Sequence, residues 1–198
     1  DINVALGPLC VIAKARLICS RVTGIDPVEN TIALAERPSL LFDVLSLNCG
    51  AEQAPITGQG MRVKPLNKFI PEWADIKKSI HANSNSASSI AIIGAGAGGA
   101  ELALSFRASL PADTGITLVG PSLLRGHGLG AVKQLKAALA EKKIDYVCDR
   151  LTAEERSTTD DTVSLKLHSS SKVIRADHVF WVTDVRAPQW LRATGIEQ

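Results

Sequence analysis

The clearest chemical signal in the sequence is a six-residue, glycine-rich motif that directly follows an apolar segment. Ile90–Ile93 runs directly into Gly94-Ala95-Gly96-Ala97-Gly98-Gly99, which has the spacing G-x-G-x-x-G, and a helix-forming segment follows. In this pattern Gly94 allows a tight turn, Gly96 lets the backbone approach a pyrophosphate, and Gly99 lets the helix pack closely on the strand. A helix N-terminus also favours an anion, because its N–H groups are unpaired and its dipole is positive there. The sequence therefore predicts dinucleotide binding at residues 94–99; the alternative is a glycine turn that packs without a ligand.

Two further side chains near this motif are candidates for contact with the ligand. Glu101 follows near the start of the helix, where its carboxylate could face the cofactor or complement the helix dipole. An acidic residue that holds the ribose hydroxyls is expected ~20 positions after the glycines, but Ile116–Val119 ends in Gly120-Pro121. Either NADH binds more weakly, or a 2′-phosphate is preferred and Arg125, with His127 beside it, meets that phosphate. An ordinary solvated loop is the third interpretation of Arg125 and His127.

The segments around the motif alternate between strand and helix patterns. The predicted strands and helices are Ile90–Ile93, Ala97–Leu110, Ile116–Val119, Gly130–Lys142 and Tyr146–Cys148. This alternation indicates a parallel sheet with right-handed crossovers. Residues 162–183 return to strand character, ending in the apolar run Val179–Val182, which suits a buried strand. The sequence therefore predicts an α/β fold.

The first 89 residues have a different pattern. Alternating apolar and polar side chains over 15–34, around Gly24–Pro27, predict a hairpin, and Leu40–Leu47 predicts a buried strand. Apolar residues at three- and four-residue spacing predict an amphipathic helix over Pro65–Ile80. The polar, serine-rich segment His81–Ser89 predicts a linker and a domain boundary.

Composition narrows the classes of partner. The chain has 198 residues, is 45% hydrophobic and carries a formal charge of +2 with no block of like charges. This argues against a nucleic-acid partner. No apolar run approaches the ~20 residues of a membrane span, and Asp1-Ile2-Asn3 lacks the basic start of a signal peptide, so a cytoplasmic location is expected.

No residue pattern predicts a metal site or a catalytic side chain. The four cysteines, Cys10, Cys19, Cys49 and Cys148, form no C-x-x-C pair, and the four histidines show no ligand spacing. The candidate site residues are therefore cofactor-binding residues, with no catalytic and no metal-ligating residue among them. They are Gly94, Ala95, Gly96, Gly98, Gly99, Glu101 and Arg125.

Several segments together resemble the pyridine nucleotide-disulfide oxidoreductase superfamily of flavoproteins. They are Val22–Pro27, Phe42–Ala51, the glycine motif with Glu101, and Val179–Asp184 followed by Ala187-Pro188. The branch that looks most similar is that of the type II NADH dehydrogenases. Val63–Phe69 and Trp181–Gly195 resemble, more narrowly, the oxidoreductase half that is fused to selenide, water dikinase in some bacteria.

The resemblance implies a Rossmann-like NAD(P)H domain inserted into an FAD-binding domain, with hydride passing from nicotinamide to flavin. Residues 88–160 would be the NAD(P)H domain, and 1–87 and 161–198 would belong to the FAD-binding region, including helix and linker. Gly94, Gly96 and Gly99 match the pyrophosphate positions, and Glu101 matches the helix position whose carboxylate lies near the nicotinamide. Dinucleotides are the expected partners, and the resemblance allows a homodimer.

The departures from the family pattern bear on FAD. The family's first glycine fingerprint, its later Gly-Asp flavin motif and its C-terminal interface domain are not found in this sequence. The expectation is an incomplete piece of an FAD-dependent NAD(P)H oxidoreductase that carries the nicotinamide site. The alternatives are a non-catalytic nucleotide-binding module, or a scaffold for a selenide, water dikinase-associated protein.

Overall fold

The structure is a computed structural model that describes residues 4–53, 58, 60–82, 87–183 and 185–196. The chain divides into two units by its contacts: unit 1 is Asp1–Gly50 with Ala187–Gln198, and unit 2 is Ala51–Arg186. The sequence-based boundaries lay instead at 87/88 and 160/161. They differ because strands from both sides of 88–160 pair within one sheet of unit 2.

That sheet has five parallel strands and holds unit 2 together. In spatial order they are β5 (Met61–Arg62), β12 (His178–Trp181), β6 (Ser89–Ile93), β7 (Gly115–Val119) and β8 (Asp145–Val147). The central strand β6 pairs Ile90 with Ile116 on one side and with His178 on the other. The carboxyl ends of the parallel strands therefore lie at one edge, where ligands bind in open α/β sheets. The parallel sheet confirms the predicted α/β class.

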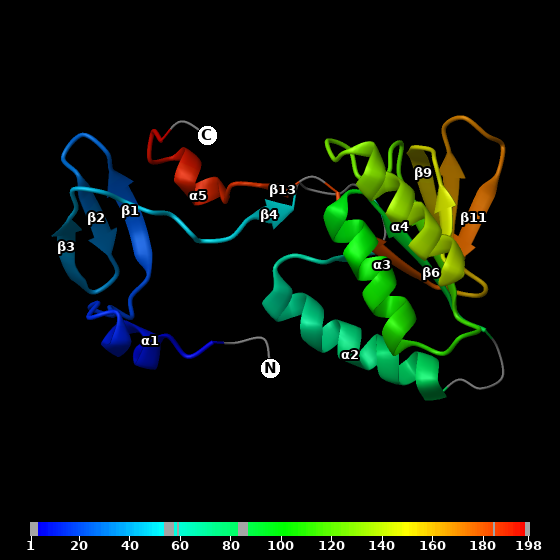
Figure 1. Cartoon of the computed structure of the whole chain (residues 1–198), viewed down its shortest axis with the longest axis horizontal. Helices are drawn as coiled ribbons and strands as arrows, with labels where there is room; N and C mark the ends of the chain where they lie inside the picture. The colour runs from blue at the N-terminus through cyan, green and yellow to red at the C-terminus, as the bar shows by residue number, and fades with distance from the viewer. Residues whose placement is uncertain (1–3, 54–57, 59, 83–86, 184, 197–198) are drawn as a thin grey trace. The chain divides into compact units, whose positions relative to one another are not determined.

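Alternate side chains of the sheet face two different layers, one of helices and one of strands. The helices are α2 (Leu66–Ala82), α3 (Ala97–Ser109) and α4 (Leu129–Glu141), and the strands are β9 (Leu151–Arg156), β10 (Val163–Leu167) and β11 (Val173–Ala176). Ile90 and Ile92 belong to the cluster shared with the helices, whereas Ala91 and Ile93 belong to the cluster shared with β10. The period of two along β6 thus separates the two cores. Figure 1 shows the ribbons of these helices and strands.

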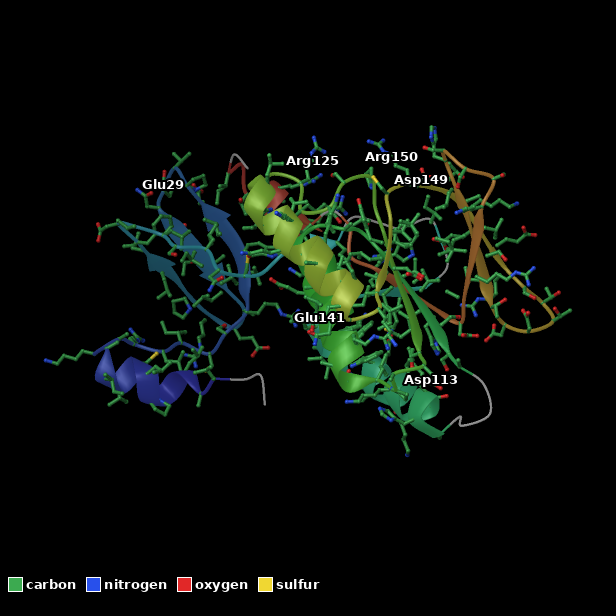
Figure 2. All side chains as sticks on the ribbon, turned by 45° about the vertical axis from the view of Figure 1, so that its right-hand side comes forward. Glu29, Asp113, Arg125, Glu141, Asp149 and Arg150 are labelled. Atoms are coloured by element: carbon green, nitrogen blue, oxygen red, sulfur yellow. The ribbon has the colours of Figure 1, made fainter. Side chains whose placement is uncertain are left out.

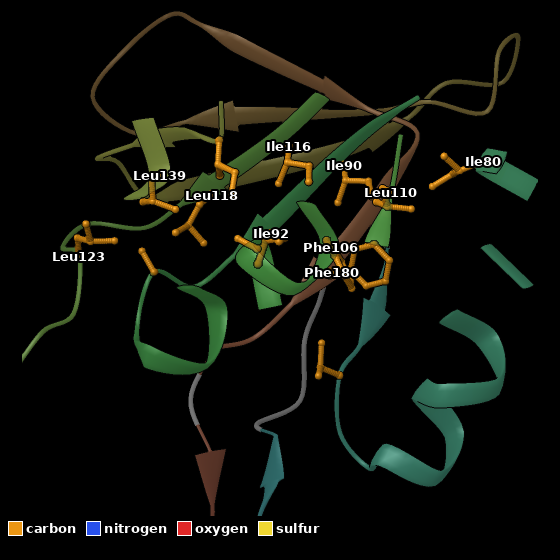
Figure 3. Close-up of a cluster of buried hydrophobic side chains, with 14 of the residues drawn as sticks. Ile80, Ile90, Ile92, Phe106, Leu110, Ile116, Leu118, Leu123, Leu139 and Phe180 are labelled. Carbon is orange, nitrogen blue, oxygen red and sulfur yellow. The ribbon is translucent and has the colours of Figure 1, made fainter. Parts of the chain in front are cut away.

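Four aromatic rings in the core under the helices contact one another. Trp73 of α2 stacks on Phe106 of α3 with centroids 3.9 Å apart, and Phe180 of β12 meets Phe106 edge-on at 4.9 Å. Phe69 also meets Phe180 edge-on. Such ring pairs add to the energy of burial, so α2 is packed on the same core as α3 (Figure 3). This packing explains why the serine-rich segment lies within unit 2; its residues 83–86 lie outside the described part of the chain.

Unit 1 contains the three-stranded antiparallel sheet β1 (Val22–Asp26), β2 (Thr31–Leu34) and β3 (Arg37–Leu41), with α1 (Leu6–Ile12) and α5 (Gln189–Arg192). The predicted hairpin is confirmed, but Gly24–Asp26 lie in β1 and the turn follows them. Asp26 Oδ1 accepts the N–H groups of Val28 and Glu29 at 2.9 Å, which closes this turn.

The predicted strand Leu40–Leu47 was wrong beyond Leu41. Strand β3 ends at Leu41, and residues 42–50 have no regular structure. Leu41 and Val44 are 82% and 88% exposed. The apolar run is therefore only partly covered, since Leu45 and Leu47 line a hollow with Ile25, and hydrophobicity alone does not make it a buried strand.

The elements of unit 2 agree closely with the sequence pattern. Strands β6, β7, β8 and β12 and helices α2, α3 and α4 all coincide with predicted segments to within one or two residues at each end. The two-stranded ribbon of β4 (Glu52–Gln53) with β13 (Val185–Arg186) was not predicted, because each strand is only two residues long. None of the helices in the described residues is long and apolar enough to cross a membrane.

Candidate dinucleotide-binding site

The glycine motif forms the turn between β6 and α3. Gly94 has φ +117°, a conformation that L side chains rarely adopt. A Cβ at this residue would lie 2.8 Å from the carbonyl oxygen of Val182, at the end of β12. The N–H of Gly94 donates to Val119 O at 2.8 Å. Only glycine can therefore follow β6 without moving the segment at the end of β12.

Gly99 sets how closely α3 approaches this turn. A Cβ at Gly99 would overlap the carbonyl oxygen of Gly94, and it would lie 3.4 Å from Leu118 Cδ1. Gly98 is less crowded, since its Cβ would meet Val182 Cγ1 at 3.4 Å. The first and last glycines of the motif thus touch each other, and this contact brings the start of the helix down onto the strand end.

Gly96 is the exception among the three motif glycines because its surroundings are open. A Cβ there would meet nothing within 4 Å, and its φ of −74° suits any residue. Gly96 is the N-cap of α3, and no side chain caps this N-terminus. The first helical bond runs from Ala100 N–H to Gly96 O at 3.0 Å, so the N–H groups of Ala97, Gly98 and Gly99 precede it. Open space in front of uncapped amides fits a pyrophosphate oxygen.

The loop after β7 is held against the glycine turn. A Cβ at Gly120 would lie 2.7 Å from both the Cβ and the N of Ala95, which is itself buried. Leu124 N–H donates to Ala95 O at 2.9 Å, and His127 N–H donates to Leu124 O at 3.0 Å. The next residue after Leu124 is Arg125, so its backbone is fixed one residue away from the turn.

The side chain of Arg125 is exposed, as is that of His127. Figure 2 shows Arg125, Asp149 and Arg150 at one end of unit 2, with Asp113 at the other end. Asp113 precedes β7, whereas Asp149 and Arg150 follow β8. Arg125 therefore lies at the carboxyl edge of the sheet, together with the glycine turn.

Glu101 lies beyond the first turn of α3, where a side chain that complements the helix dipole would stand. It is the fifth residue of α3, whose first turn contains no acidic residue, and its side chain is exposed. Because the dipole effect falls off within the first turn, this position argues against the interpretation that Glu101 complements the dipole. The interpretation that its carboxylate faces the cofactor stays a prediction.

Sequence reasoning missed a hollow beside this edge and the acid in it. The hollow has a volume of about 320 Å³ and is lined by Pro121, Cys148, Asp149, Arg150, His168 and Ser169. The carboxylate of Asp149 accepts the N–H of Arg150 at 2.7 Å and the N–H of Ser169 at 3.0 Å. Burial alone would raise the pKa of Asp149, but these bonds and nearby His168 outweigh it and hold the pKa below its ordinary value.

A second missed residue is Gln53, whose side chain is buried between three segments. Its Nε2 donates to Trp181 O at 2.6 Å, and its Oε1 accepts the N–H of Lys64 at 3.0 Å. Gln53 thus joins the end of β12 to the segment before α2. A lone glutamine has no sequence signature, so only the fold reveals this role.

No metal centre accompanies the site in the part of the chain that the structure describes. There, no group of three or more His, Cys, Asp or Glu side chains is arranged to hold a metal ion. The site that the residues build is an anion-accepting turn at the carboxyl edge of a parallel sheet, the arrangement of a dinucleotide-binding domain.

The family model for pyridine nucleotide-disulphide oxidoreductases matches residues 13–198. The chain therefore belongs to the pyridine nucleotide-disulphide oxidoreductase family. A search of curated protein sequences gives no match.

Solved structures with the same fold extend well beyond this chain. An NAD-dependent persulfide reductase from A. fulgidus has a TM-score of 0.63 and 19% identity, over 96% of this chain and 36% of its own. An engineered water-forming NADPH oxidase bound to NADPH has a TM-score of 0.61 and 17% identity, over 87% of this chain and 38% of its own. An FAD-dependent pyridine nucleotide-disulphide oxidoreductase from Desulfovibrio vulgaris has a TM-score of 0.58 and 22% identity, over 93% of this chain and 48% of its own. The chain thus spans less than half the length of each of these proteins.

The contact between Gly99 and Gly94 predicts a large difference between two glycine-to-alanine variants. Gly99→Ala is expected to lower the free energy of unfolding by about 1–3 kcal/mol, because the new methyl overlaps a backbone carbonyl. Gly96→Ala is expected to cost less, about 0.5–1 kcal/mol, because the methyl meets no atom and only a poorer N-cap residue is introduced. Urea unfolding followed by tryptophan fluorescence measures both. Equal stability of the two variants would contradict the close packing.

The hydrogen bonds to Asp149 predict a pH-dependent contribution to stability. Because folding lowers its pKa, Asp149 stabilises the fold above the unfolded-state pKa of about 3.9, and this contribution is lost as pH falls through the folded value. The melting temperature of Asp149→Asn should lie below that of the wild type at pH 7, and the gap should close as pH falls below about 4. Asp113→Asn is the control. A gap that stays constant with pH would mean that the ionised carboxylate contributes nothing.

Proposed function

We propose that this chain supplies the nicotinamide dinucleotide site of an FAD-dependent NAD(P)H oxidoreductase. The observation that carries the proposal is the open space at Gly96, in front of the uncapped N-terminus of α3. Gly94 and Gly99 have no room for a side chain, so the packing of the turn accounts for them. Packing does not account for Gly96, whereas a pyrophosphate lying against it does.

The residues of the site bind and orient rather than react. The amides of Ala97, Gly98 and Gly99 would hold the pyrophosphate, and the loop of Gly120 and Leu124 would line the adenosine end. When bound, NAD(P)H supplies a hydride from its nicotinamide ring. Glu101 would lie toward the nicotinamide, as the family resemblance implies. No side chain of the site needs to act as a general acid or base.

The choice between NADH and NADPH depends on the loop after β7. Gly120 stands where an acidic residue would bind the ribose hydroxyls, so the chain lacks the usual group that favours NADH and repels a 2′-phosphate. Arg125 is exposed at the same edge and has a side chain suited to phosphate. If Arg125 meets the 2′-phosphate, the site should prefer NADPH. If Arg125 is only solvated, the site should bind NADH weakly.

Unit 1 does not fit an FAD site by its described residues alone. Among the residues of unit 1 that the structure describes, the buried hydrophobic side chains are those of Ile25 and Leu191. We therefore assign unit 1 to the FAD-binding region by family resemblance and derive no step through the flavin. Its exposed apolar side chains, such as Leu41 and Val44, would contact further parts of that region.

The same observation favours a second candidate, a nucleotide-binding module without catalytic activity. In that case the site at residues 94–99 would bind the dinucleotide and pass no hydride on. The narrower proposals, a type II NADH dehydrogenase or the oxidoreductase half fused to selenide, water dikinase, rest on short segments such as Val63–Phe69 and Trp181–Gly195. A cytoplasmic location and a homodimer remain proposals of the same kind.

Calorimetric titration of the purified chain with NADH and with NADPH tests the proposal. The wild type should bind at least one of them, and Gly96→Val should abolish binding while it keeps the circular dichroism spectrum, because the new side chain enters open space. Gly7→Val, at another open glycine in α1, is the matched control and should bind normally. A Gly96→Val protein that binds as the wild type does would refute the site.

The same titration with Arg125→Ala decides between the two interpretations of the loop. If Arg125 meets the 2′-phosphate, the variant should lose about tenfold or more in affinity for NADPH and keep its affinity for NADH. Unchanged affinity for both would leave Arg125 as a solvated side chain.

A further inference from the structure

The loop that carries Arg125 depends on a side chain from the neighbouring strand. The hydroxyl of Tyr146, in β8, donates to Gly120 O at 3.0 Å. Gly120 is buried, and it lies where β7 ends and the loop begins. Its N–H donates to Val147 O at 3.1 Å. Both the N–H and the carbonyl of Gly120 are therefore hydrogen-bonded to β8, one to its main chain and the other to a side chain.

A chain of contacts leads from Tyr146 to the glycine turn. Gly120 lies against Ala95, since a Cβ at Gly120 would come within 2.7 Å of it. Ala95 in turn accepts the N–H of Leu124 at 2.9 Å. Leu123 is buried in the core with which Tyr146 packs. The loop is therefore fixed at its start by Tyr146 and at its middle by the turn that would receive the pyrophosphate.

The ring of Tyr146 alone would serve the core, so its hydroxyl needs a separate explanation. Without the hydroxyl, the buried carbonyl of Gly120 would lose a donor, and an unpaired buried carbonyl drives local rearrangement. Burial raises the pKa of Tyr146, and the Cys148 thiol beside it raises the pKa further. The hydroxyl therefore keeps its proton and remains a donor at every physiological pH.

From these contacts we infer that Tyr146 is a positioning residue that holds the 120–128 loop in the place where it contacts the adenosine end of the dinucleotide. The inference rests on the proposed function, because it assigns the loop a ligand. Tyr146 itself does not touch the dinucleotide. Its effect passes through Gly120 and Ala95 to the backbone of Leu124 and Arg125.

Tyr146→Phe tests the inference because it removes the hydroxyl and keeps the ring. Thr152→Val is the matched control, since Thr152 Oγ1 donates to Lys166 O at 3.1 Å between β9 and β10 and serves no part of the site. In titrations with NADH and NADPH at a temperature where all variants are folded, Tyr146→Phe should bind about three- to tenfold more weakly. Thr152→Val should bind as the wild type does.

Amide hydrogen exchange separates positioning from a general loss of stability. In Tyr146→Phe the N–H of Leu124 should exchange about tenfold faster, while the N–H of Val182, which donates to Ile93 O, should exchange at the wild-type rate. Equal acceleration at both amides, or unchanged affinity for the dinucleotides, would overturn the positioning role. If the wild type binds neither dinucleotide, the proposed function fails and the positioning role fails with it, whatever the exchange rates.

Discussion

The candidate site depends on the contact between Gly99 and the carbonyl of Gly94. Because neither residue has a side chain, α3 can begin directly at the end of β6, and its first amides point out at the carboxyl edge of the sheet. A methyl group at either position would separate helix from strand or move Val182. Close packing in one place therefore creates the open, uncapped N-terminus next to it, and an anion-accepting site requires that opening.

The neighbouring strands extend this constraint across the edge of the sheet. β12 supplies the carbonyl of Val182 beside Gly94, β7 leads into Gly120 beside Ala95, and β8 supplies Tyr146 and the turn at Asp149. Each contact joins backbone to backbone or side chain to backbone, so the loops are fixed relative to the glycine turn. The rigid scaffold thus presents exposed side chains such as Arg125, which is the usual division between scaffold and binding loop.

The fold of unit 2 could be predicted because local patterns and tertiary packing agree there. Ile90–Ile93 is apolar on both faces, and both faces are buried, by helices on one side and by β10 on the other. Leu40–Leu47 has a similar pattern, but Leu41 and Val44 are exposed, and the strand stops at Leu41. The packing roles of Gly94 and Gly99 followed from the spacing of the motif. The contacts of Tyr146, Asp149 and Gln53 did not, because they join segments that are distant in sequence through single polar groups with no repeating pattern.

The central claim is that the amides at the start of α3 bind the pyrophosphate of a dinucleotide, and amide chemical shifts measure this most directly. In a titration of the ¹⁵N-labelled chain with NADH and with NADPH, the account predicts that the largest saturable shifts fall on Gly96, Ala97, Gly98 and Gly99. Smaller shifts should appear in residues 120–125. Shifts concentrated elsewhere, or no shift in the first turn of α3 at saturating dinucleotide, would contradict it.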